Sequence, residues 1–168
     1  MADQKVAYSS NTTITCTLAS LATSATWVAG VESSLIDNTS NLYVDALVQG
    51  LITVGTTPTA NTSIIVYVWG SNVSPATTVI DVIDGTDSAE TISSAGVRNS
   101  FMKVGAVLDV DSNTSNRGYP FSFGVAQLFG GVLPSYWGLF VSHNTGVNLN
   151  STGGNHVISY RGQYFTVA

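Results

Sequence analysis

Residues 121–167 decide the fold and read FSFGVAQLFGGVLPSYWGLFVSHNTGVNLNSTGGNHVISYRGQYFTV. Three segments of this stretch alternate as β-strands do, and loops rich in Gly, Asn and Ser separate them. In residues 121–126 the bulky side chains share one face, whereas residues 136–143 are apolar on both faces and predict burial on both sides. Residues 156–167 are rich in aromatic and β-branched side chains, which favours a third strand. The stretch predicts three adjoining strands.

The rest of the chain continues the β pattern. Residues 42–54 form the longest alternation, and a turn-rich connection leads to the alternating residues 63–69, so these two segments predict an antiparallel hairpin. Residues 88–100 lack strand alternation and are the place where a helical turn or two is expected. Further strands are expected at residues 12–18, through Trp27, at 79–83 and at 101–110. Eight or nine strands without alternating helices predict an all-β fold, a sandwich or a barrel.

The 168 residues correspond to about one domain, with residues 1–10 expected as an amino-terminal arm and residues 11–168 as a single β-domain. Five Lys and Arg residues and a net charge of -5 argue against a nucleic-acid partner bound through a basic face. No apolar run approaches the roughly 20 residues of a membrane span, so no membrane partner is expected. Residues 1–10 lack a secretory signal, which predicts a chain made in a cytoplasm.

Charged residues make up only 9% of the chain, while 44% of residues are hydrophobic. This combination has two interpretations: a domain with much of its surface covered by neighbours, or a β protein whose polar surface is supplied by Thr, Ser and Asn. Cys16 is the only cysteine, so no intramolecular disulfide forms. Its place in the alternating residues 12–18 predicts a small buried apolar side chain rather than a reactive thiol.

The sequence contains no catalytic, cofactor-binding or metal-binding signature. The two histidines, His143 and His156, lie at the ends of expected strands beside Asn-rich loops, and no third ligand lies near them in the sequence. Hydrogen bonding within the loops is the expected role of both. The Gly-x-Ser-x-Gly pattern of a nucleophilic serine is absent. We expect a protein that is not an enzyme.

Two groups of acidic residues are candidates for a cation site. Asp109, Asp111 and Asn113 match the opening of a calcium loop, but Thr114 stands where that loop needs glycine and Pro120 where it needs glutamate. A denser acidic cluster consists of Asp81, Asp84, Asp87 and Glu90. Its expected role is a solvated acidic loop, and the alternative is a weakly held calcium.

Aromatic side chains offer a further possibility, because exposed rings can stack on sugars. The candidates for such a platform are Tyr136, Trp137, Tyr160 and Tyr164. Aromatic residues at strand spacing more often belong to a core or a subunit interface, and that is the competing interpretation.

Several segments together resemble a family of small virion structural proteins of tailed bacteriophages. The segments are 26–33 (TWVAGVES), 36–39 (IDNT), 43–45 (YVD), 84–90 (DGTDSAE), 142–146 (SHNTG) and 154–156 (GNH). The resemblance implies a β-sandwich of jelly-roll type that acts as a capsid decoration or cement protein. It further implies a homotrimer bound to the major capsid protein, located on the virion. A tail, baseplate or fibre module that binds host surface glycan is the alternative.

Overall fold

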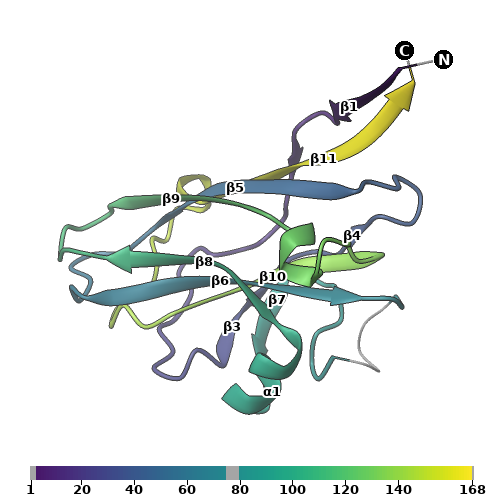
Figure 1. Ribbon diagram of the computed structural model, residues 1–168. Coiled ribbons are helices and arrows are strands. Elements are labelled where there is room, and N and C mark those ends of the chain that lie inside the picture. The colour runs from purple at the N-terminus through teal and green to yellow at the C-terminus, as the bar shows by residue number, and fades with distance from the viewer. Residues whose placement is uncertain (1–2, 75–79, 168) are drawn as a thin grey trace.

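The structure, a computed structural model, describes residues 3–74 and 80–167, which form a sandwich of two antiparallel β-sheets (Figure 1). The prediction of an all-β sandwich is confirmed, while the jelly-roll type stays a prediction. None of the helices in the described residues is long and apolar enough to cross a membrane.

Sheet A has five strands in the order β1-β11-β5-β9, with the short β2 also paired to β11. The bounds are β1 Gln4–Tyr8, β2 Thr12–Thr13, β5 Asp45–Thr53, β9 Gly118–Gly124 and β11 Val157–Val167. Sheet B has six strands in the order β7-β3-β10-β6-β8, with the short β4 paired to β10. The bounds are β3 Ala29–Glu32, β4 Ile36–Asp37, β6 Thr62–Ser71, β7 Ser88–Thr91, β8 Lys103–Val110 and β10 Tyr136–His143.

Helical structure in the described residues is short. The helix α1 spans Ala95–Phe101 and begins at Ser94, whose hydroxyl accepts a hydrogen bond from the backbone N–H of Val97. Two single turns of 3-10 helix, η2 and η3, span Ala126–Phe129 and Gly153–Asn155. The expected helical turns in residues 88–100 are therefore confirmed for the second half of that segment, which belongs to α1. The first half contains the edge strand β7.

The main core lies between the sheets and takes one face from each. Trp137, Leu139 and Val141 of β10 point into it, as the alternation of residues 136–143 predicts. From sheet A the buried partners include Val48 and Ile52 of β5. Apolar burial of this kind is the dominant favourable contribution to folding.

A second apolar cluster covers the opposite face of sheet B. Tyr67 and Trp69 of β6 and Phe140 of β10 pack there against residues from the 80–102 segment. Arg98 of α1 lies over the Tyr67 ring at 5.0 Å and donates hydrogen bonds to the backbone carbonyls of Thr26 and Trp27. The central strands β6 and β10 of sheet B are thus buried on both faces.

Gly138 of β10 permits the close packing in this second cluster. A methyl group on Gly138 would lie 2.5 Å from the Trp69 ring, the residue directly opposite it in β6. Only a residue without a side chain leaves room for the indole at this pair.

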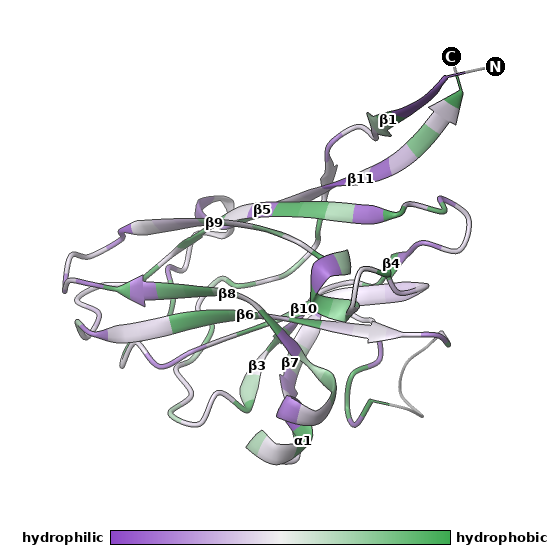
Figure 2. Ribbon diagram, viewed as in Figure 1, coloured by the Kyte–Doolittle hydropathy of each residue, from purple (hydrophilic) through white to green (hydrophobic). Residues whose placement is uncertain are grey.

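Sheet A has one uncovered face, which we call the outer face. It consists of the odd-numbered residues of β5 and β11 and the even-numbered residues of β1 and β9, which point away from sheet B. Figure 2 shows hydrophobic bands on β5 and near the end of β11 that belong partly to this face. Leu47, Leu51 and Val157 are among its exposed side chains.

The expected amino-terminal arm is itself a strand. Gln4–Tyr8 pairs with β11 from Gln4↔Val167 to Tyr8↔Gln163, and the two strands project together beyond the body of the sandwich (Figure 1). We call this two-stranded ribbon the arm. Beyond Gln163, β1 is the only strand among the described residues that pairs with β11.

Two predictions about strand pairing are wrong. The segments 42–54 and 63–69 do not form a hairpin, because β5 lies in sheet A and β6 in sheet B. The three strands of residues 121–167 do not adjoin either, since β9 and β11 flank β5 whereas β10 is central in sheet B. Burial explains the separation: β6 and β10 are apolar on both faces and need cover on both sides, whereas β5 carries polar side chains on its outer face.

Three predicted strands are also shorter, displaced or absent. Within residues 12–18 only Thr12–Thr13 pairs, although Ile14 and Leu18 are buried as the alternation indicates. Trp27 adopts a positive φ of 53° just before β3 begins, so the strand starts two residues later. Of the expected strand 79–83, Val79 lies outside the described residues, and Ile80–Ile83 is closed by a turn from the Ile83 N–H to the Ile80 carbonyl.

Substitution of Leu139 measures how much the main core contributes to the stability of the fold. Leu139 is fully buried in β10, and Leu139→Ala should lower the free energy of unfolding by about 2–5 kcal/mol through lost burial and the cavity left behind. Chemical denaturation measures this. The matched control is Leu42→Ala, since Leu42 is 74% exposed and should change stability by less than about 0.5 kcal/mol. Similar losses for the two variants would contradict the assigned core.

Candidate functional site

His143 is a structural residue at the end of β10. Its side chain is fully buried, and its Nε2 lies 3.0 Å from the carbonyl oxygen of Leu21. Since a carbonyl only accepts, Nε2 carries the hydrogen, and Nδ1 faces the Thr145 hydroxyl at 2.9 Å. Burial lowers the pKa of this imidazole, so the neutral form is favoured. The residue ties the loop at Leu21 to the strand.

His156 has the same type of role in sheet A. Its Nε2 lies 2.9 Å from the Asn150 carbonyl oxygen, and its Nδ1 accepts from the backbone N–H of Thr53 at 3.4 Å. The predicted role of both histidines, hydrogen bonding at the loops, agrees with these contacts. The described residues contain no group of three or more His, Cys, Asp or Glu side chains able to hold a metal ion.

The acidic cluster of residues 81–90 is engaged in separate hydrogen bonds. Asp81 accepts from the backbone N–H and hydroxyl of Ser93, and these contacts lower the pKa of its carboxyl. Asp87 accepts in the same way from Thr17, at 2.8 Å and 2.6 Å. Asp84 accepts from the N–H of Thr86 within its own turn, and Glu90 from the hydroxyl of Ser88. The four carboxylates hold loops in place and do not converge.

The segment that matches the opening of a calcium loop also makes contacts within the chain. Asp111 forms an ion pair with Arg117 at 3.0 Å and accepts a hydrogen bond from the Tyr119 hydroxyl at 3.1 Å. The pair is exposed on both sides and therefore contributes little to stability. Asp109 lies on the exposed side of β8 and does not form a cluster with Asp111.

The proposed sugar platform is split by the fold, and this candidate is wrong as a set. Trp137 and Tyr160 are buried in the main core, where their rings meet edge to face with centroids 5.4 Å apart. Tyr136 is half-buried, and Tyr164 packs beside Tyr43 at the base of the arm. The competing interpretation, that these aromatics build the core, holds for Trp137 and Tyr160.

Cys16 packs against the main core and is half-buried, whereas the sequence predicts a small buried apolar side chain. Burial strongly raises the pKa of its thiol, and the nearby carboxylates of Asp87 and Glu32 raise it further. The thiolate is the reactive form, so the raised pKa disfavours reaction of this cysteine at neutral pH.

Glu32 is a buried carboxyl that the sequence pattern does not single out. Its side chain is fully buried, and it accepts hydrogen bonds from the backbone N–H groups of Gly85 at 2.6 Å and Asp84 at 3.1 Å. Burial raises the pKa of Glu32 to about 7; the carboxylates of Asp84 and Glu90 act in the same direction, and the two backbone donors oppose them. A signal was present, because Glu32 is the only charged residue in the apolar segment 28–33.

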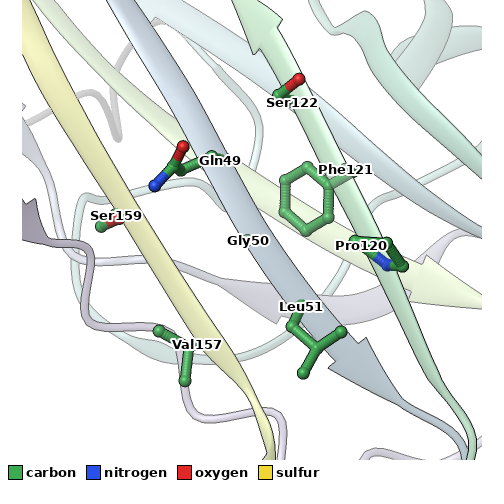
Figure 3. A pocket seen from close by; sticks show the side chains of 8 residues that line it. All are labelled: Gln49, Gly50, Leu51, Pro120, Phe121, Ser122, Val157 and Ser159. Atoms are coloured by element: carbon green, nitrogen blue, oxygen red, sulfur yellow. The ribbon is translucent and has the colours of Figure 1, made fainter.

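Sheet A carries a shallow groove of about 680 Å³ on its outer face. Figure 3 shows its apolar side chains, Leu51 of β5, Pro120 of β9 and Val157 of β11, side by side across three strands, with the polar Gln49, Ser122 and Ser159 in the next row. Within residues 3–74 and 80–167, no ionisable side chain lines this groove. Its chemistry suits apolar contact rather than catalysis.

A scan of protein-family models and searches of curated proteins and of solved structures found no match to this chain.

Glu32 makes stability depend on pH. Its pKa is about 7 in the folded state against an ordinary value of 4.5, so the folded protein binds more protons between these values. Stability should therefore fall as pH rises from about 4.5 to 7, by about 3 kcal/mol in total for this group. Urea unfolding at a series of pH values measures the slope, and Glu32→Gln should remove it.

The chain contains one other glutamate, and Glu90→Gln is the matched control. This variant should retain most of the slope, since Glu90 is only a minor contributor to the raised pKa of Glu32. A pH profile that is the same in Glu32→Gln as in the unaltered protein would contradict the assignment.

Proposed function

We propose that this chain is a non-enzymatic structural protein of a phage virion, a decoration protein that binds the major capsid protein and stabilises the head shell. The resemblance of its segments to small phage virion proteins supports the setting. The make-up of its surface supports the mode of action, which is burial against neighbouring proteins rather than chemistry at a site.

The observation that carries this proposal is the exposed surface. Among the described residues, fifteen large hydrophobic side chains are exposed. The entire chain has only fifteen charged residues, ten acidic and five basic. Covering such a surface removes few ions from water, and the desolvation of ions is the main cost of burying a polar surface. The surface is therefore suited to being covered.

The polar side chains support the same function. His143, His156 and the acidic residues 81–90 make hydrogen bonds within the domain that hold its loops. A cement protein acts through interfaces spread over its surface and needs no convergent polar site. The trimer that the resemblance implies stays a prediction.

Addition of the purified protein to head shells that lack it tests the function. The protein should co-sediment with the shells to saturation and raise the temperature at which they break open. Because the proposed contacts are mainly apolar, the bound amount should change little between about 0.1 M and 1 M salt. Shells whose sites are already filled serve as the control. Absence of binding with unchanged heat resistance would exclude the function, and loss of binding in high salt would exclude apolar contact as its basis.

A further inference from the structure

The arm exposes apolar side chains that its own chain leaves uncovered. On the outer-face side of the arm, Val6, Phe165 and Val167 are 51%, 53% and 71% exposed, and Val6 lies directly opposite Phe165. A two-stranded ribbon is marginally stable in water when nothing packs on it. Figure 1 shows the arm extending beyond the body on the side away from sheet B.

The opposite end of the same face carries the apolar groove. Leu51, Pro120 and Val157 form one row across β5, β9 and β11. Between groove and arm the face is mainly polar, with Ser159 and Gln49 in one row and Arg161 beside Leu47 in the next. The outer face thus has two apolar ends and a polar middle.

The groove and the arm are equally far from Gly162 along β11. Along β11, Val157 of the groove lies five residues before Gly162, and Val167 of the arm lies five residues after it. A two-fold axis that lies between two such faces and crosses β11 near Gly162 would therefore place the arm of each copy over the groove of the other. We propose that two copies of this chain pack outer face to outer face in this way.

The charges of the face agree with this arrangement. Of the residues that the structure describes, two charged ones lie on it, Asp45 of β5 and Arg161 of β11. They occupy adjacent rows on either side of Gly162, since Asp45 pairs with Gln163 and Leu47 with Arg161. The two-fold relation brings Arg161 of one copy toward Asp45 of the other, so opposite charges meet.

The apolar area matches what a stable dimer needs. Seven of the fifteen exposed large hydrophobic side chains lie on the outer face. About half exposed, they present on the order of 500 Å² of apolar surface. A standard interface covers roughly 800 Å² on each partner, of which roughly 57% is apolar. A self-complementary patch of this size is what a two-fold contact requires.

Shell binding is not assumed in this inference. The contact is two-fold and so differs from the trimer that the resemblance implies, and the measured mass separates the two. Light scattering should give twice the chain mass of 17.5 kDa. Phe165→Asp and Leu51→Asp should each halve that mass, while Leu42→Asp, a change at an exposed residue off the face, should leave it unchanged. Circular dichroism and thermal unfolding verify that the variants fold.

Cross-linking tests the arrangement itself in a Cys16→Ser background. Val157→Cys and Val167→Cys lie ten residues apart on one strand, roughly 33 Å, so a linker of about 10 Å, the spacing of packed sheets, cannot join them within a chain. The double variant should give cross-linked dimers, and each single variant should not. A monomeric mass, a trimer unaffected by the aspartate variants, or efficient cross-linking of Val167→Cys alone would each overturn the proposal. Shell binding by a monomeric Phe165→Asp variant would leave the decoration function intact.

Discussion

Two antiparallel strands, β6 and β10, pair along their length from Tyr136↔Ser71 to His143↔Ile64, and both are apolar on both faces. A strand pair of this kind is stable in water only when it is covered from two sides. Sheet A covers one face, and α1 with the 80–92 segment covers the other. The positions of the remaining elements, including the loops held by His143 and Glu32, follow from this requirement.

The sequence predicted the elements of the fold better than their pairing. Alternation in residues 42–54, 63–69 and 136–143 correctly identified β5, β6 and β10, because side-chain period is a local property. The expected β5–β6 hairpin is wrong because the short connection crosses from one sheet to the other, and no local pattern records which sheet a strand joins. The strand in the arm was not predicted for a related reason: residues 4–8 become a strand through pairing with residues 163–167.

The same contrast holds for the candidate site: local features were predicted from the sequence, and long-range contacts were not. The loop roles expected for His143 and His156 agree with the structure, since strand ends beside Asn-rich loops offer backbone partners. Trp137 and Tyr160 were ambiguous, because the sequence shows strand spacing but not which face meets the second sheet. Glu32 was not singled out, since its environment consists of backbone N–H groups more than fifty residues away. Such contacts arise only when folding brings residue 32 next to residues 84 and 85.

The position of β11 has a consequence for how the chain folds during synthesis. As the last strand of the described chain, β11 lies between β1 and β5; it is the partner strand of β1 and one of the two partner strands of β5. Before β11 leaves the ribosome, β1 has no partner and β5 pairs with β9 alone. Sheet A can therefore be completed only after β11 has been synthesised, and it depends on contacts of high sequence separation, which form slowly. Sheet B, complete once β10 is made, can act as the template on which β11 completes sheet A.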